Sequence, residues 1–160
     1  RFYDVLFHSC INPLQNLKIR EVKNEDSAIL LDWRNDPDVR KYAFNTNEIE
    51  RDSHKKWLRQ KVSEKDCKIF IFETKQGHPV GQVRLDYVNN KWLINYSIDK
   101  YFRGLGLGKK TINQTIGTID KGSFLAKVKS NNQASIKTFK SLGFKNDFED
   151  MNYDNFEFIK

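Results

Sequence analysis

A glycine-rich segment in the middle of the chain has the residue types and spacing of an anion-binding loop. It reads R-G-L-G-L-G-K over residues 103–109, between a strand-like run that ends at Asp99 and a helix-like run from Thr111 to Asp120. Glycines let a backbone approach a ligand closely because no Cβ atom stands in the way. The start of a helix adds unpaired N–H groups and the positive end of a dipole. The segment therefore predicts a phosphate-binding site.

Two common phosphate-binding motifs do not fit this loop. A dinucleotide-binding fingerprint needs G-x-G-x-x-G and an acidic residue about 20 positions later. Here the spacing is G-x-G-x-G, and residues 124–128 contain no acid. A Walker A loop needs Gly-Lys-Ser/Thr, where this chain has Gly108-Lys109-Lys110. The loop by itself leaves the phosphate-bearing ligand open.

The positive charge of the chain is concentrated around the same loop. The formal net charge is +7, and the stretch from Lys100 to Lys140 contains nine basic residues and one acid, Asp120. This excess favours a small polyanion as ligand, although solvated faces of helices and strands would give the same count. Because the stretch lacks the interleaving of aromatic and basic residues that a base-stacking platform has, nucleic acid is not expected as a partner.

Length and composition indicate one globular domain. A chain of 160 residues can bury a substantial core, and its 38% hydrophobic content argues against disorder. No apolar run is long enough to span a membrane. Two lone cysteines without metal spacing fit a reducing cytoplasm, and the scattered histidines predict no metal site. Residues 1–16 are poorly patterned and predict a linker or peripheral arm before a domain at residues 17–160. A start without Met suits a trimmed chain or fusion to an upstream enzyme domain.

Hydrophobic periodicity predicts the elements that position the loop. Helices are expected at residues 24–35, from Asn47 through Val62, at 111–120 and at 132–142, and strands at 17–22, 68–74, 83–87, 92–99 and 124–128. Asn47 and Glu50 resemble a capping box. Residues 145–160 predict a hairpin that turns near Asp154-Asn155. The order is β-α-α-β-β-β-α-β-α-β-β, a mixed α/β (α+β) domain.

Two motifs in the right order resemble the Gcn5-related N-acetyltransferase (GNAT) family. Residues 103–108 match the R/Q-x-x-G-x-G/A signature, and residues 132–144 match the N-x-x-A/S-x-x-x-Y/F-x-x-x-G-F segment. The resemblance covers residues 17–160. It implies the GNAT fold, a mixed and mostly antiparallel sheet of about seven strands flanked by about four helices. It also implies direct acetyl transfer from acetyl-CoA to a primary amine.

The resemblance implies a donor site residue by residue. The pyrophosphate of acetyl-CoA would lie on the N–H groups of the loop, and the thioester in a V-shaped opening between the strand ending at Asp99 and the strand at 124–128. The pantetheine arm would pair with the strand around Ile98. The expected donor-binding residues are Ile98, Arg103, Gly104, Leu105, Gly106, Leu107, Gly108, Lys109, Asn132, Ser135 and Phe139. Helix capping by Asn132, a surface charge at Arg103 and simple packing at Phe139 are the alternatives.

The proton-transfer groups are less evident. Many family members have a tyrosine acid where this chain has Phe139, and a glutamate base where it has Leu93. Tyr96 and Tyr101 are the candidate acids, with packing as the alternative for both. His54 is a candidate base, although its helical face also carries large apolar residues, which fits a half-buried structural histidine.

The segment from residue 31 to residue 58 is expected to select the acceptor. Its W-R-N-D-P-x-x-R stretch, followed by H-x-x-W, resembles GNAT members that acetylate the 4-amino group of a UDP-linked amino-dideoxy sugar, on the route to nonulosonic acids such as pseudaminic acid. Related openings occur in members that acetylate ribosomal-protein N-termini or spermidine, so a protein or polyamine amine is the alternative. A non-catalytic acyl-CoA-binding module is a third hypothesis. The candidate acceptor-side residues are Arg34, Asn35, Tyr42, Asn45, Arg84 and Asp86.

Overall fold

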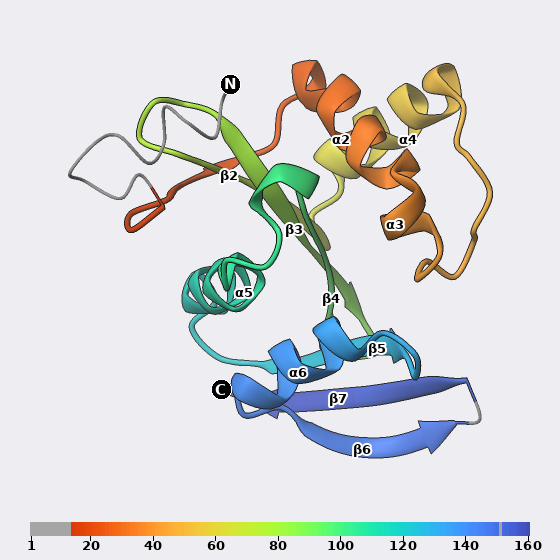
Figure 1. The fold of residues 1–160 in the computed structure, drawn as a ribbon, viewed down its shortest axis with the longest axis vertical. Coiled ribbons are helices and arrows are strands. Elements are labelled where there is room, and N and C mark those ends of the chain that lie inside the picture. Colours follow the sequence, from red (N-terminus) through yellow and green to blue (C-terminus); the bar gives the residue numbers. More distant parts are fainter. Residues whose placement is uncertain (1–13, 151) are drawn as a thin grey trace.

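A seven-stranded sheet forms the centre of the computed structural model, which describes residues 14–150 and 152–160 (Figure 1). Its strand order is β1-β2-β3-β4-β5-β7-β6, and every neighbouring pair is antiparallel except β4–β5, which is parallel. The strands are β1 (Lys18–Glu21), β2 (Cys67–Glu73), β3 (Pro79–Val88), β4 (Lys91–Ile98), β5 (Ser123–Lys129), β6 (Lys145–Asp150) and β7 (Tyr153–Ile159). The predicted mixed, mostly antiparallel sheet is confirmed. Most of the predicted arm at residues 1–16 lies outside the described residues.

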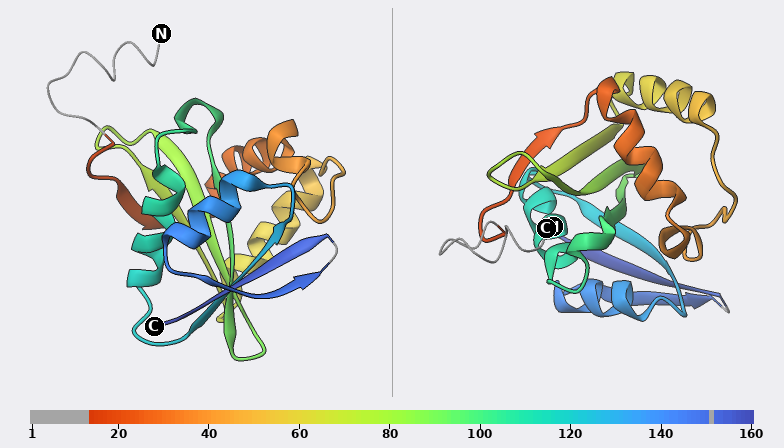
Figure 2. Two further views of the ribbon diagram at one scale, coloured as in Figure 1. Left: turned by 60° about the horizontal axis from the view of Figure 1, so that its bottom comes forward. Right: turned by 45° about the horizontal axis from the view of Figure 1, so that its top comes forward.

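Helices cover both faces of this sheet (Figure 2). One face carries α2 (Ser27–Asn35), α3 (Pro37–Arg40) and α4 (Arg51–Ser63), and the other carries α5 (Leu107–Gly117) and α6 (Gln133–Ser141). Two 3-10 turns, η1 (Asn24–Asp26) and η2 (Lys100–Phe102), precede α2 and follow β4. None of the helices within the described ranges is long and apolar enough to cross a membrane.

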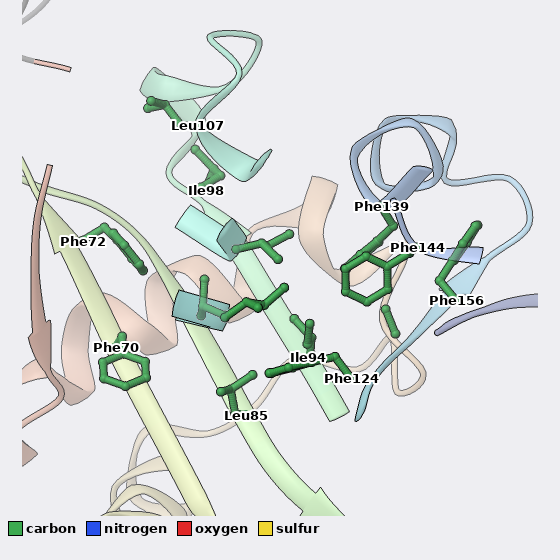
Figure 3. Close-up of a cluster of buried hydrophobic side chains, with 14 of the residues drawn as sticks. Phe70, Phe72, Leu85, Ile94, Ile98, Leu107, Phe124, Phe139, Phe144 and Phe156 are labelled. Carbon is green, nitrogen blue, oxygen red and sulfur yellow. The ribbon is translucent and has the colours of Figure 1, made fainter. Parts of the chain in front are cut away.

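Alternation along β2 divides the core between the two faces. Ile69 and Ile71 pack with Leu30, Trp33 and Leu58 from α2 and α4. The intervening residues of β2 join the larger cluster under α5 and α6, where side chains from β2, β3, β4 and β5 meet (Figure 3). Because successive side chains of a strand point to opposite faces, one strand supplies both cores. The apolar-on-both-faces pattern of residues 68–74 is therefore that of an internal strand.

The two strands at the centre separate along their length. β4 and β5 pair only from Lys91–Leu93 to Ser123–Leu125, although β4 continues to Ile98 and β5 to Lys129. The backbone N–H of Asp99 donates to the carbonyl of Val80 at 2.8 Å, and the β3–β4 register is regular. Since successive N–H groups of a strand point to opposite sides, those of Tyr96 and Ile98 point away from β3. They face the V-shaped opening.

Two predicted boundaries were wrong, and tertiary contacts explain both. The second helix begins at Arg51 and not at Asn47, because the side-chain amide of Asn35 holds the N–H and carbonyl of Ile49, each at 2.9 Å. This residue is therefore fixed outside the helix. The C-terminal hairpin turns between Asp150 and Tyr153, because residues 153–159 pair along β5 and carry the predicted turn residues inside β7.

The helices differ from the prediction at two further points. The helix after the glycine loop begins at Leu107, directly after Gly106, instead of at Thr111. A short extra helix, α3, starts with Pro37 in its first turn, and the carboxylate of Asp36 accepts the N–H of Asp38 at 2.8 Å. Proline suits the first turn of a helix because its missing N–H has no partner there. The chain therefore resumes a helix at the proline that ends α2.

Candidate active site

A cavity of about 1020 Å³ lies where the two central strands separate. Residues from α2, the α3–α4 segment, β3, β4, the glycine loop, β5 and α6 line it. Pockets for single small ligands measure about 300–1,000 Å³. This cavity is thus large enough to hold parts of two substrates side by side.

The glycine loop at its rim has the conformation that only glycine adopts at low cost. Gly104 and Gly106 have φ angles of +76° and +73°, and Gly106 is the N-cap of α5. A Cβ built on either glycine would have nothing within 4 Å. The start of α5 therefore faces open space in the cavity, and its N–H groups and dipole suit a phosphate group. This geometry fits the pyrophosphate of a CoA molecule.

A hydroxyl pair joins β4 to α6 next to this loop. The Tyr96 hydroxyl lies 2.9 Å from the hydroxyl of Ser135, and its ring meets Phe139 edge-on with the centroids 5.8 Å apart. A Cβ at Gly108 would lie 3.0 Å from the Tyr96 ring, so a larger residue there would require the ring to shift. Burial raises the pKa of Tyr96, although hydrogen bonds with Ser135 and Thr138 oppose the shift. The phenol is therefore protonated at neutral pH and able to donate.

Asn132 caps the helix that carries Ser135. Its side-chain oxygen accepts the backbone N–H of Ser135 at 3.2 Å, and it also lines the cavity. Asn132 therefore caps the helix, which was the alternative role considered for it. It also remains in the cavity lining near the glycine loop.

Arg103 is occupied by protein groups. Its Nε donates to the carbonyl of Ile98 at 3.0 Å, and its Nη2 donates to a carboxylate oxygen of Asp36 at 3.0 Å. The sequence predicted a donor-binding arginine at this position. The structure places Arg103 in the cavity lining, where it also holds the end of β4 against the α2–α3 junction.

The opposite half of the cavity contains Arg34, His54 and Arg84. Nη2 of Arg34 donates to the carbonyl of Asn45 at 2.5 Å, while its buried Nη1 has no hydrogen-bond partner among the described residues. Burial lowers the pKa of Arg34, and the charges of Arg40 and Arg84 lower it further. Arg84 is ion-paired with Asp86 and Arg40 with Glu48, whereas no carboxylate among the described residues pairs with Arg34.

His54 is buried behind these arginines. Its Nδ1 lies 3.1 Å from the hydroxyl of Ser27, and its ring packs against Trp57 with the centroids 5.2 Å apart. Burial lowers the pKa of His54, and the charge of Arg34 lowers it further. The imidazole is therefore neutral at pH 7, as a proton acceptor must be.

The predicted site residues divide into those that line the cavity and those that lie elsewhere. Tyr42 and all the predicted donor residues except Leu105 line it, together with the residues described above. Tyr101 and Asn35 lie at a separate depression on the outer side of α2. Asn35 braces Ile49, and the Asp86 carboxylate accepts from Arg84 at 2.7 Å and from Lys61 at 3.3 Å. Leu105, Asn45 and Asp86 are not among the residues that line the cavity.

Sequence reasoning missed a set of three polar side chains on β3 and β4 that lines the cavity. The side-chain amide of Gln82 donates to Asn95 at 3.1 Å and to the hydroxyl of Ser97 at 3.4 Å, and all three line the cavity. The signal was present, because polar residues 95 and 97 alternate with apolar residues 94 and 98. They occupy the face opposite Tyr96.

The residues that line the cavity include neither a metal-binding cluster nor a cysteine. Within the described ranges no three His, Cys, Asp or Glu side chains gather as a metal site requires. Burial, assisted by Asp86, raises the pKa of Cys67 to about 11, so this thiol is not a nucleophile at neutral pH. The polar side chains that line the cavity carry hydroxyl, imidazole, amide, guanidinium and ammonium groups and one carboxylate, that of Asp38.

Comparison with known families gives one match over most of the chain. Residues 16–145 match the acetyltransferase (GNAT) domain. The uncharacterized protein MJ1062 of Methanocaldococcus jannaschii is 26% identical over 133 residues, which are 79% of this chain and 28% of that protein. The chain therefore spans little more than a quarter of this longer relative.

Solved structures share the fold. A domain from Methanocaldococcus jannaschii superposes with a TM-score of 0.80 at 22% identity, covering 91% of this chain and 99% of the other. Spermidine N-acetyltransferase from Vibrio cholerae, in complex with CoA and spermine, gives 0.77 at 16% identity, covering 89% and 95%. Ribosomal-protein-S5-alanine acetyltransferase from Vibrio fischeri gives 0.77 at 17% identity, covering 91% and 93%. These identities support the fold alone.

Proposed function

The chain belongs to the acetyltransferase (GNAT) domain family, and on this premise we propose that it acetylates the 4-amino group of a UDP-linked amino-dideoxy sugar. Acetyl-CoA is the acetyl donor that the family uses, and a structural neighbour is a complex with CoA. The acceptor is the part of the proposal that goes beyond family membership.

The observation that supports this choice of acceptor is the charge of the cavity. Seven Lys or Arg residues line it, against a single lining acid, Asp38. Two of the seven, Arg84 and Arg103, are ion-paired with carboxylates outside the lining, which leaves an excess of positive charge. Such a lining attracts polyanions. The phosphates of CoA account for cations near the glycine loop. Arg34 and Arg84 lie in the other half, where a second anion would satisfy the free Nη1 of Arg34. A planar guanidinium binds phosphate oxygens well, so a diphosphate on the acceptor fits this half.

A polyamine or a protein N-terminus is the second candidate acceptor. Structural neighbours carry the names of a spermidine and a ribosomal-protein acetyltransferase, and the side-chain oxygens of Gln82, Asn95 and Ser97 would accept hydrogen bonds from an ammonium group. A polycation would have to enter beside Arg34 and Arg84, which disfavours it electrostatically. We therefore favour the anionic acceptor.

The proposed chemistry is direct attack of a neutral amine on the thioester carbonyl, forming a C–N bond and breaking the C–S bond. The backbone N–H of Tyr96, which faces the opening, would stabilise charge developing on the carbonyl oxygen. The phenol of Tyr96 would supply the proton to the departing thiolate, a role that tyrosine in place of Phe139 has in many relatives. Neutral His54 would take the proton that the amine loses, directly or through water.

A free-thiol release assay over an acceptor panel tests this function. The panel contains a UDP-linked 4-amino-dideoxy sugar, spermidine, a peptide beginning with alanine, and a reaction without acceptor. Thiol release dependent on the nucleotide sugar supports the proposal, and release dependent on spermidine or the peptide supports the second candidate. Tight acetyl-CoA binding without release above hydrolysis for any acceptor would instead indicate a non-catalytic acyl-CoA module.

A further inference from the structure

Two side-chain bridges connect the end of β4 to the α2–α3 junction. The indole N–H of Trp33 donates to the Asp99 carboxylate at 2.8 Å, and Arg103 donates to the Asp36 carboxylate at 3.0 Å. The partners are 66 and 67 residues apart in the chain. Figure 1 shows the turn after β4 beside α2. The bridges therefore join the loop that faces CoA to the segment that faces the acceptor.

The two oxygens of the Asp36 carboxylate accept different hydrogen bonds. One oxygen accepts the N–H of Asp38 and so caps α3, and the other accepts from Arg103. Burial would raise the pKa of Asp36, but the N–H of Asp38 and the guanidinium of Arg103 outweigh it, and the pKa lies below its ordinary value. The carboxylate is thus charged at neutral pH. Movement of Arg103 would disturb the start of α3 directly.

Two of the five N–H groups of Arg103 are already bonded to protein acceptors. Its Nε is bonded to the carbonyl of Ile98 and its Nη2 to Asp36, while Nη1 lies 3.6 Å from the Asp38 carboxylate. Two neighbouring carboxylates offset its charge. The backbone N–H groups at the start of α5 remain as phosphate donors without any help from this side chain.

The helix that Asp36 caps leads into the wall of the acceptor half. Residues 41–43 follow α3 and line the cavity, and the ammonium group of Lys129 on β5 donates to the carbonyl of Lys41 at 3.0 Å. A displacement of the glycine loop would be transmitted through Arg103 and Asp36 to this wall.

We propose that Arg103 is a positioning residue that couples CoA binding at the glycine loop to ordering of the acceptor wall at residues 37–45. Coupling between two sites is reciprocal, so an acceptor that orders this wall also tightens CoA binding. The proposal rests on the assignment of the loop to CoA and is independent of which amine is the acceptor.

Hydrogen exchange with and without saturating CoA tests the coupling. In the wild-type protein CoA should slow amide exchange both at residues 104–110 and at residues 37–45. In Arg103→Gln and Asp36→Asn, saturating CoA should still protect the loop but no longer the wall. Arg20→Gln is the matched control, because Arg20 is 30% exposed against 31% for Arg103, is ion-paired to Asp26, and lies outside the cavity lining. It should behave as the wild type.

Measuring the affinities of the variants for CoA and for pantetheine distinguishes a positioning role of Arg103 from direct contact with a phosphate. If Arg103 acts through Asp36, the two single variants and the double variant should weaken CoA binding by the same factor, about 5-fold or more. The preference for CoA over pantetheine, which lacks the phosphates, should therefore change to the same extent in Arg103→Gln and in Asp36→Asn. Protection of residues 37–45 that persists in Arg103→Gln would overturn the proposal. So would a loss of CoA preference over pantetheine in Arg103→Gln that is absent in Asp36→Asn, since Arg103 would then be a phosphate ligand.

Discussion

The substitution Gly106→Glu should weaken CoA binding strongly while leaving the fold intact. Gly106 has a φ of +73°, and an ideal Cβ at this position meets no atom within 4 Å. The new side chain therefore fits, and the main cost to stability is the left-handed backbone, about 1–2 kcal/mol for a residue other than glycine. A single domain normally tolerates a loss of this size.

The effect on binding is larger because the carboxylate would stand where the pyrophosphate is expected. Two like charges 4 Å apart repel by about 1 kcal/mol in water and by about 4 kcal/mol at the effective dielectric of a protein surface. Since 1.4 kcal/mol is a factor of ten, the dissociation constant should rise by about one to three orders of magnitude.

Thermal unfolding with and without saturating acetyl-CoA measures this effect, with two controls. Gly106→Ala has the same backbone strain without the charge. Gly77→Glu has the same substitution at a φ of +87° with open space around it, in the turn between β2 and β3 and outside the cavity lining. Acetyl-CoA should raise the melting temperature of both controls but not of Gly106→Glu. An unchanged shift in Gly106→Glu would refute the loop assignment, and an equal loss in Gly106→Ala would show that conformation, not charge, is responsible.

Four further substitutions test the rest of the cavity. Arg84→Gln should raise the KM for the nucleotide sugar about tenfold or more, as loss of a charged hydrogen bond predicts, with the KM for acetyl-CoA unchanged in steady-state assays. Tyr96→Phe should lower kcat about 100-fold, whereas Phe139→Tyr should not reduce it; a large loss in Phe139→Tyr would mean that this ring packs away from the thiolate. Wild-type stability should fall as pH drops below about 6.5, because the unfolded state binds a proton more readily than buried His54. Denaturant titrations of His54→Gln should show a weaker pH dependence, and an identical slope would contradict the assigned cause.

The shape of the glycine loop and the cap of α6 could be predicted from sequence because their geometry is local. Gly104 and Gly106 occupy the positive-φ positions of a single continuous loop. The cap of α6 by Asn132 lies likewise within a few residues. Where neighbours along the chain determine the structure, residue types and spacing were sufficient.

The acceptor half depends on residues that only the fold brings together. The start of α4 is displaced because Asn35 holds Ile49 from 14 residues away. The carboxylate partner of Arg103 is Asp36, which is 67 residues away in the chain. Pairing of Gln82 with Asn95 and Ser97 requires the β3–β4 register. Sequence patterns indicate which side chains are polar but not which of them already have partners.

The contribution of the UDP group to acceptor selection is the most direct test of the proposed function. The measurement compares kcat/KM for a UDP-linked 4-amino-dideoxy sugar, for the same amino sugar without UDP, and for spermidine, at equal acetyl-CoA concentration. A cationic acceptor half predicts that removing UDP lowers kcat/KM about tenfold or more, the equivalent of a single charged hydrogen bond. Spermidine should be the poorest of the three. Equal values with and without UDP, or a preference for spermidine, would contradict the account.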